Sequence, residues 1–412
     1  MPSSPPTPAR RPVRRPAGSS NCSARSDYVD KPDDGRLVTS AINGVLSALD
    51  PHSSYIDAKS FRDLQVTGLF AGLGMQLDME GGLLKVVSPI DDTPAAKAGI
   101  LAGDVITRLD DTPMQGLNLY QAVEMMRGAP GTEVRLEITR KDSSPLKLTL
   151  TRQIIKINAV RPQAEGGDVG YVRLTQFTSR GYEDLKQGFQ ALAAQIPPDQ
   201  AKGYILDLRN NPGGLLDQAV RVAGAFLTSG GDIVSVRGRN PEPVQRFNAA
   251  PGDLIDGKPL IVLINGGSYS ASEIVAGALQ DNKRATILGS RSFGKASVQT
   301  IIPLGQGNGA LRLTTARYYT PSGHSLQAQG IGPDIEVLQD VPKEIAAQAQ
   351  PRSESTLPGH LKAEGEEEKG SQAYIPRDAK DDKALQTAIA LIRGTETNPA
   401  FPPSPKQAAT QP

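Results

Sequence analysis

The sequence predicts an α/β core with a smaller α+β domain inserted ahead of it. The core is indicated by two nearly all-apolar runs, 204–208 and 260–264, which suit strands covered on both faces. From residue 168 onward such strands alternate with segments of helical periodicity. Residues 68–155 instead show short strands and two short helices. A length of 412 residues accommodates two or three domains at about 150 residues each.

The N-terminal part of the chain is expected to be a disordered tail followed by a helical region. The tail, residues 1–27, holds six prolines and four arginines in its first sixteen positions. No apolar segment follows these charges, so we predict no signal peptide in this sequence. The helical region, residues 28–65, contains an amphipathic helix over 36–49. Its apolar side carries Leu37, Ile42, Val45, Leu46 and Leu49.

The inserted domain is expected to span residues 66–155. Its first helix begins at Thr93-Pro94, an N-cap followed by proline at the first helical position, and ends at Gly99. A second helix covers about 119–127. The expected strands are 83–87, 105–109, 134–139 and 146–150.

The α/β core is expected to span residues 156–340. Strands are predicted at 170–174, 203–208, 259–264 and 285–289, and helices near 182–194, 216–227 and 270–280. Residues 341–375 are rich in Glu, Gln, Pro and Ser and are expected to form a linker or long loop. A C-terminal helix within 376–396 begins at Asp382 and ends at Gly394. Beyond it, the expected Pro/Gln tail is 397–412.

The composition excludes several classes of function. The net charge is +1 and only 4% of residues are aromatic, with no tryptophan, so we expect no nucleic-acid partner. No run of about 18 apolar residues is present, and no membrane-spanning segment is therefore expected. The single cysteine, Cys22, cannot form a disulfide within the chain.

A nucleophile is suggested where an apolar strand runs into a Gly-Gly turn, three serines and a helix, at 260–280. A serine in such a turn projects its hydroxyl at the carboxyl edge of the sheet, where open α/β folds bind ligands. The N-terminus of the helix also supplies N–H groups that can stabilise a developing oxyanion. The candidate serines are Ser268, Ser270 and Ser272.

The general base for such a serine could be a histidine or a lysine. None of the three histidines, His52, His324 and His360, lies in a recognisable triad context, and His52 in Asp-Pro-His is expected to be a turn residue. Lys295, in the loop after strand 285–289, is the alternative. Lowering a lysine pKa from about 10.4 costs about 1.4 kcal/mol per unit, so this lysine requires a dry pocket. The near-match of 289–296 to a phosphate-binding loop lacks the hydroxyl residue that would hold magnesium, which disfavours nucleotide binding.

The segments Gly267–Ile274 and Phe293-Gly-Lys295 resemble those of the carboxyl-terminal processing peptidases, also called tail-specific proteases. In that family a serine and a lysine twenty-five residues apart form a dyad, and a glutamine four residues after the lysine orients it; the same spacings occur here. The resemblance implies a crotonase/ClpP-like protease core without metal or cofactor. It implies these roles: Ser270 as nucleophile, Lys295 as general base, Gln299 as the orienting residue, and the N–H groups of Ala271 and of Gly213 or Gly214 as oxyanion donors.

The resemblance covers about 28–337 and the C-terminal helix, and it has two departures. Tyr269 stands beside the nucleophile where the family usually has alanine. Ala296 follows the lysine where glycine is common. Both substitutions flank catalytic positions, and neither removes a reacting group.

The inserted domain resembles a bacterial PDZ domain, through Gly72-Leu-Gly-Met75 and Thr93–Asp104. Backbone N–H groups of such a loop can hold a peptide carboxylate while the adjoining strand pairs with the peptide. The resemblance implies recognition of an apolar C-terminus and gating of the active site. The candidate residues are Gly72, Leu73, Gly74 and Met75 in the loop and Val123 and Met126 on the helix, although the last two also fit plain domain core.

These features favour a serine endopeptidase that cleaves proteins near their C-termini, with peptides or proteins as partners. An inactive peptide-binding scaffold of the same fold is the alternative, and Tyr269 is the residue that raises it. An acyl-CoA enzyme of the crotonase type is disfavoured by the PDZ insert. The resemblance implies a periplasmic or exported protein, whereas this sequence shows no signal peptide, so a cytoplasmic location stays open. A homo-oligomer through the terminal helices is suggested by analogy only.

Overall fold

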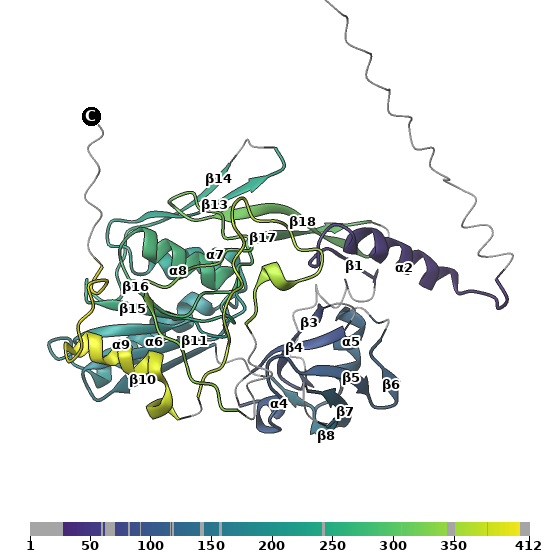
Figure 1. Cartoon of the computed structure of the whole chain (residues 1–412), viewed down its shortest axis with the longest axis horizontal. Helices are drawn as coiled ribbons and strands as arrows, with labels where there is room; N and C mark the ends of the chain where they lie inside the picture. Colours follow the sequence, from purple (N-terminus) through teal and green to yellow (C-terminus); the bar gives the residue numbers. More distant parts are fainter. Residues whose placement is uncertain are drawn as a thin grey trace, which may run out of the picture.

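The computed structural model describes residues 28–58, 61, 71–80, 83–90, 92–115, 117, 119–140, 144–155, 159–240, 244–305, 307–343, 351–376 and 378–403. Within these ranges a larger α/β body lies beside a smaller lobe that carries α4, α5 and strands β3 to β8 (Figure 1). The predicted tail at 1–27 lies outside the described residues, and so do residues 404–412 of the tail predicted at 397–412. Among the helices that the structure describes, every one is too short or too polar to cross a lipid bilayer.

The main sheet of the larger body has the strand order β10-β11-β12-β15-β16-β19. The pairings from β11 to β19 are parallel, and β10 is antiparallel to β11. Every residue of β12 and β15 is buried, which confirms that the apolar runs are strands covered on both faces. The bounds are β10 (Val160–Glu165), β11 (Val169–Leu174), β12 (Gly203–Asp207), β15 (Leu260–Ile264), β16 (Thr286–Gly289) and β19 (Ile335–Glu336).

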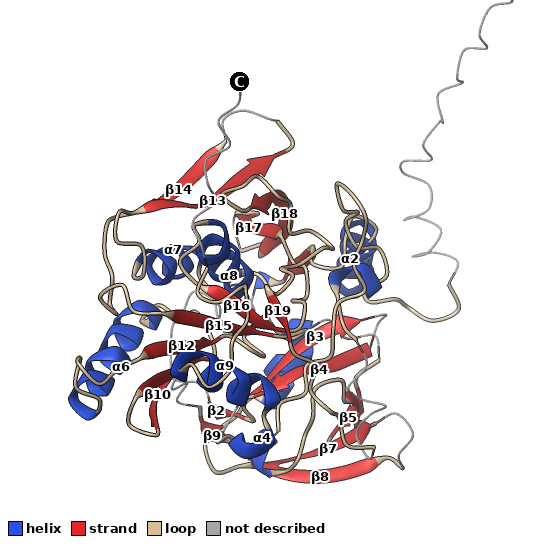
Figure 2. Cartoon of the chain, turned by 60° about the vertical axis from the view of Figure 1, so that its left-hand side comes forward, coloured by secondary structure: helices blue, strands red, loops and turns tan. Residues whose placement is uncertain are grey.

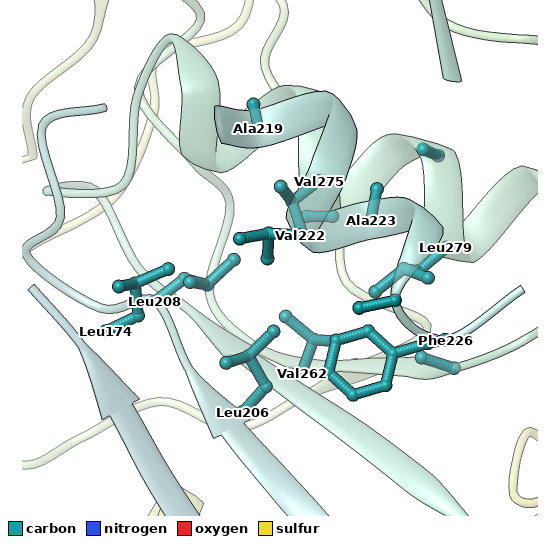
Figure 3. Close-up of a cluster of buried hydrophobic side chains, with 14 of the residues drawn as sticks. Leu174, Leu206, Leu208, Ala219, Val222, Ala223, Phe226, Val262, Val275 and Leu279 are labelled. Atoms are coloured by element: carbon teal, nitrogen blue, oxygen red, sulfur yellow. The ribbon is translucent and has the colours of Figure 1, made fainter. Parts of the chain in front are cut away.

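Helices cover both faces of this sheet. On one face α6 (Gly181–Gln195), α7 (Leu216–Gly224) and α8 (Ala271–Asp281) pack on alternate strand residues. Figure 3 shows side chains of α7 and α8 above Leu206 and Val262 of the sheet. The intervening strand residues face α9 (Lys383–Arg393) on the opposite side. Two apolar layers therefore hold the α/β core together.

A second, antiparallel sheet lies over the α7–α8 face of the body. Its order is β1-β18-β13-β14, and β17 also pairs with β18. The strand β1 belongs to the N-terminal region, so the chain start is joined to the body through Ser54 opposite Arg312. The bounds are β1 (Ser54–Ile56), β13 (Gly231–Gly238), β14 (Gln245–Ala249), β17 (Ser297–Pro303) and β18 (Ala310–Tyr319).

The N-terminal helix α2 (Asp34–Ser47) occupies most of the range that the sequence predicts. Its predicted apolar side is only partly covered by the described residues. Leu46 is buried, whereas Val45 is 68% exposed and Leu49 lies exposed just beyond the helix.

The smaller lobe has its own hydrophobic core and a sheet of order β3-β4-β5-β7-β8, with β6 beside β5. Thr93 precedes α4, and Gly99 has φ 78° where the predicted helix end requires a left-handed residue. Strands β2 and β9 pair where the chain enters and leaves the lobe. The bounds are β2 (Ala71–Gly72), β3 (Met75–Glu80), β4 (Leu83–Pro89), α4 (Pro94–Lys97), β5 (Val105–Leu109), β6 (Thr112–Pro113), α5 (Leu119–Met126), β7 (Glu133–Thr139), β8 (Leu146–Thr151) and β9 (Gln153–Ile154).

Residues 351–376, here called the strap, run across the larger body with little secondary structure of their own (yellow-green in Figure 1; Figure 2 draws such loops in tan). A 3₁₀ turn, η1 (Glu354–Thr356), lies in the strap and a second, η2 (Ala379–Asp381), precedes α9. The strap is held by backbone bonds to the body: Glu354 N–H to Phe293 O at 2.9 Å, Glu368 N–H to Ala328 O at 2.9 Å and Gly266 N–H to Gln372 O at 3.2 Å. The described part of the predicted linker is thus a long loop fastened to the core.

Candidate active site

The three serines after β15 have different surroundings. The hydroxyls of Ser268 and Ser272 are buried and each donates to a backbone carbonyl, that of Leu208 and that of Asn211, both at 2.7 Å. Ser270 instead lines a cavity. Ser270 is therefore the serine of this turn that a substrate can reach.

Ser270 has an uncommon backbone conformation, with φ 60° and ψ −117°. A positive φ is costly for a residue with a Cβ and is typical of functional turns. The loop that faces Ser270 requires glycine at position 213, because a Cβ there would lie 2.9 Å from Ser270 Cβ and 2.8 Å from Ala271 N. Gly214, with φ 144°, has equally little room, since a Cβ there would meet the Phe177 carbonyl oxygen at 2.2 Å. The Gly-Gly pair thus brings its backbone against the serine turn.

The backbone N–H groups around Ser270 differ in their partners. Ala271 is the first residue of α8, so its N–H has no acceptor within the helix. The Gly213 N–H already donates to Asn211 Oδ1 at 2.9 Å. Of the two glycines that the sequence left open as an oxyanion donor, Gly214 is therefore the better candidate.

Lys295 and Gln299 line the same cavity as Ser270. Lys295 lies in the loop between β16 and β17, and its Nζ donates to Gln299 Oε1 at 2.8 Å. Gln299 is held in turn by its Nε2, which donates to Ser297 Oγ at 3.0 Å and Thr314 Oγ1 at 3.1 Å. The structure thus brings the predicted serine, lysine and glutamine together on one cavity.

Sequence reasoning missed Glu273, a fully buried residue of α8. Its carboxylate accepts from the N–H groups of Ser270 at 2.8 Å, Gly294 at 2.7 Å and Lys295 at 2.9 Å, and from Ser292 Oγ at 2.6 Å. Burial raises the pKa of Glu273 to about 7, against the lowering effect of these donors. The spacing of a serine and a glutamate three residues later at a helix start, a capping-box pattern, was the available signal.

A buried ion-pair network supports the loop of Gly213 and Gly214. Arg209 contacts Asp207 at 2.6 Å and Asp382, the N-cap of α9, at 2.8 Å. Burial alone would raise the pKa of Asp207, but the charge and hydrogen bonds of Arg209 lower it overall. The C-terminal helix is therefore tied directly to the loop beside Ser270.

His52 lies in a turn, as the sequence predicts, and also contacts the strap. Its Nε2 is 2.9 Å from Glu354 Oε1, and both side chains are buried. Gln327 joins the same group, because its Nε2 donates to Glu354 Oε1 at 3.1 Å and its Oε1 accepts from Ala296 N at 3.2 Å. The strap is thus linked to the residue next to Lys295.

The cavity has a volume of about 870 Å³ and is lined by both lobes. The larger body contributes the serine, lysine, glutamine and glycines described above. The smaller lobe contributes Gln76, Leu77 and Met79 of β3 together with Leu117 and Leu119. A chain bound along β3 would therefore lie close to Ser270.

The six residues predicted to bind a peptide in the smaller lobe do not line this cavity. Leu73 and Met126 are only 3% and 4% exposed and belong to the core of the lobe, so they offer a ligand little surface. The other four are Gly72 in β2, Gly74 with φ 76° before β3, Met75 at the start of β3 and the half-buried Val123 in α5.

The fold and this site define the class of the protein as a serine peptidase with an inserted PDZ domain. The family model described as "Peptidase family S41" matches residues 168–337, and the model described as "PDZ domain" matches residues 71–150. Both matches fall on the lobes that the structure separates.

Similar proteins specify the family further. The chain is 55% identical over 388 residues to a "Carboxy-terminal-processing protease" of Bartonella bacilliformis, covering 93% of this chain and 89% of that one. It is 38% identical over 326 residues to a "Carboxyl-terminal-processing protease" of Synechocystis sp., covering 76% and 74%. The solved structure of a photosystem II D1 C-terminal processing protease matches with a TM-score of 0.63 and 29% identity, covering 80% and 89%. The chain belongs to the family of carboxy-terminal-processing proteases, which confirms the resemblance, the fold class and the serine-peptidase activity.

Proposed function

We propose that this endopeptidase cleaves polypeptides near their C-termini with a dyad of Ser270 and Lys295. The Ser270 hydroxyl attacks the scissile carbonyl while its proton passes to the Lys295 amine. Lysine then gives that proton to the leaving amine, and a water molecule hydrolyses the acyl-enzyme in the same manner. The N–H groups of Ala271 and Gly214 stabilise the oxyanion of each tetrahedral intermediate.

The observation that carries this proposal is that Ser270 and Lys295 line one cavity while Gln299 accepts a hydrogen bond from the lysine at 2.8 Å. A lysine acts as a base only as the neutral amine, and its orientation relative to serine decides whether it can take the proton. Gln299 supplies the orientation through its side-chain oxygen.

We further propose that the PDZ domain binds the C-terminus of a protein or peptide substrate and gates the site. Support comes from the shared cavity, because Leu77 and Met79 of β3 face the same space as Ser270. A peptide added along β3 would pair through its backbone and place apolar side chains on these residues. We take 66–155 as the PDZ domain and 156–340 as the protease core, since the matched ranges lie inside them. By family resemblance, we propose a periplasmic or exported location.

The dyad is tested by incubating wild type, Ser270→Ala and Lys295→Ala with casein, an unfolded protein, with and without an apolar C-terminal peptide. We expect each substitution to lower kcat/KM by about 10³-fold or more at an unchanged Tm. Ser229→Ala and Lys186→Ala, both exposed and remote from the cavity, serve as matched controls. The peptide should raise wild-type activity and leave both dyad variants inactive.

An inert wild type that still binds the peptide would support the scaffold alternative. The ring of Tyr269 packs against Phe293 with centroids 5.3 Å apart, next to both catalytic segments. Tyr269→Ala is then the variant to assay, because a gain of cleavage would identify this ring as the obstruction.

A further inference from the structure

We propose that Asp50 and Thr314 are positioning residues that set the amide orientation of Gln299 and, through it, the Lys295 amine. The inference rests on the proposed Ser-Lys dyad and extends the catalytic support to two residues distant in the sequence. Neither touches the reacting atoms, and both act through Gln299.

A chain of hydrogen bonds connects these residues. Lys295 Nζ donates to Gln299 Oε1 at 2.8 Å, and Gln299 Nε2 donates to Thr314 Oγ1 at 3.1 Å. Thr314 Oγ1 then donates to Asp50 Oδ1 at 3.1 Å. The chain runs from the N-terminal region to the catalytic loop.

The fold brings the members of this chain together by two local features. A register shift between β17 and β18 places Gln299 opposite Thr314, so the bulge aims both side chains at the same side. The turn before β1 holds Asp50, whose carboxylate also accepts from the N–H groups of His52 at 2.8 Å and Ser53 at 2.9 Å. Ser53 Oγ donates to Asp50 Oδ2 at 2.8 Å and accepts from Thr314 N at 3.1 Å.

In this series of hydrogen bonds, the order of donors and acceptors is fixed from Asp50 to Lys295. All partners of Asp50 described above are donors, so its oxygens act as acceptors and the Thr314 hydroxyl points its hydrogen at Asp50. The Thr314 oxygen then accepts from the Gln299 amide nitrogen. The amide oxygen is left facing Lys295, whose amine donates to it and keeps its lone pair for the Ser270 proton.

The reversed amide would inhibit the base. If Gln299 turned its nitrogen toward Lys295, the amine would accept that N–H with the lone pair that catalysis needs. Such a contact also favours the neutral amine over the ammonium, so the lysine would titrate at lower pH and still be a poorer base. Among the described residues, the titratable groups near Lys295 also include Glu273, which is bonded to its backbone N–H. The same cavity is lined by His52, Arg312 and Arg352 and by two tyrosines, Tyr269 and Tyr318.

The test compares Thr314→Val, which removes the hydroxyl at similar volume, with Thr314→Ser, which retains it. We expect Thr314→Val to lower kcat by about 10-fold or more with KM nearly unchanged, because part of the general-base contribution is lost. The acid limb of its pH–kcat profile should move to lower pH. Thr314→Ser should stay within about 3-fold of wild type. Thr315→Val is the matched control, since Thr315 is the adjacent exposed residue of the same strand.

A second readout does not depend on catalysis. Lysine labelled with ¹³C at its ε-carbon is titrated in the Ser270→Ala protein, with the Lys295 signal assigned by its loss in Lys295→Ala. Thr314→Val should shift the midpoint of this titration to lower pH, and Thr314→Ser should not. Asp50→Ala removes the oxygen that accepts from Thr314 and should act in the same direction, which keeps the inference testable if Thr314→Val does not fold.

Unchanged kcat and an unchanged titration midpoint in both Thr314→Val and Asp50→Ala would overturn the inference. Equal losses in Thr314→Val and Thr314→Ser without any pH shift would also overturn it, since they would indicate a packing role. If Lys295→Ala retained full activity, the dyad itself would fail, and the titration would still show whether Thr314 orients the amide.

Discussion

Glu273 joins the Ser270 turn to the Lys295 loop through one carboxylate. It receives backbone N–H groups from Ser270 on one side and from Gly294 and Lys295 on the other. Those donors favour the ionised form, whereas complete burial opposes it and raises the pKa to about 7. The Glu273 side chain therefore holds the geometry of the site, but burial penalises its ionised form, and this penalty makes the stability of the protein depend on pH.

This opposition predicts the pH dependence of stability. Between pH 4.5 and about 7 the unfolded carboxyl is ionised while the folded one stays protonated, so the free energy of unfolding falls as pH rises. The contribution of Glu273 should amount to about 3 kcal/mol, at about 1.4 kcal/mol per unit. The free energy of unfolding of wild type minus that of Glu273→Gln should decline over this window and be level above it.

Urea unfolding followed by circular dichroism measures this difference, since the chain has no tryptophan to report by fluorescence. A difference that stayed constant from pH 4.5 to 8 would show that Glu273 titrates at the same pH in both states. Activity should fall in Glu273→Gln, because an amide cannot accept from all the donors that the carboxylate serves.

At the scale of secondary-structure elements, α9 does more than cover one face of the sheet. Its N-cap, Asp382, accepts from Leu385 N at 3.1 Å and from Arg209 at 2.8 Å. The same side chain thus begins the helix and anchors the arginine that holds the Gly213 loop. Packing of α9 and the shape of the catalytic loop should therefore respond to the same substitution.

Asp382→Ala should lower the free energy of unfolding by about 3 kcal/mol, because it removes a helix cap and one of the two acidic partners that the described residues give to the buried Arg209. Asp382→Asn keeps a capping oxygen and should cost about half as much. Lys383→Ala, which removes a largely exposed ion pair with Asp340, should stay within about 0.5 kcal/mol. If the alanine variant were as stable as wild type, burial of the Arg209 charge would not require the ion pair with Asp382.

For the whole molecule, the strap matters because it touches both lobes. Arg352 Nη1 donates to Val87 O in β4 of the PDZ domain at 3.4 Å, and two residues later Glu354 is bound to the catalytic body. Leu357 and Pro358 of the strap also line the shared cavity. A change in the position of the PDZ domain would therefore pull on the segment that supports Lys295.

Arg352→Ala should make the PDZ domain easier to displace. The substitution removes the long hydrogen bond to Val87 O, which contributes about 1 kcal/mol to holding the PDZ domain in place. The peptide concentration that gives half-maximal stimulation should therefore fall by about 5-fold. The measurement is a titration of casein cleavage with the apolar peptide. The control is Arg239→Ala, an exposed residue between β13 and β14. An unchanged midpoint, with normal peptide binding, would assign gating to contacts other than the strap.

Several features followed from local sequence alone. The apolar runs of β12 and β15 became fully buried strands, and Asp382 and Gly394 began and ended α9 as predicted. The spacing of Ser270, Lys295 and Gln299 pointed to residues that the structure gathers on one cavity. These signals are readable because strand burial, helix capping and motif spacing each depend on residues close together in the chain.

Other features were decided only by tertiary structure. Thr314 and Asp50 are 264 positions apart in sequence, and the bulge that aims Thr314 at Gln299 has no local signature. Composition predicted a linker or a long loop at 341–375, and it could not show the attachment to the body, which is made by backbone groups of the strap. Met126 fits a groove or a core equally well by pattern, and burial made it core. The sequence by itself determined the fold class and the family, and it predicted the reacting groups that we propose. Tertiary structure decided which distant donors and acceptors lie around them, because a hydrogen bond depends on positions in space rather than along the chain.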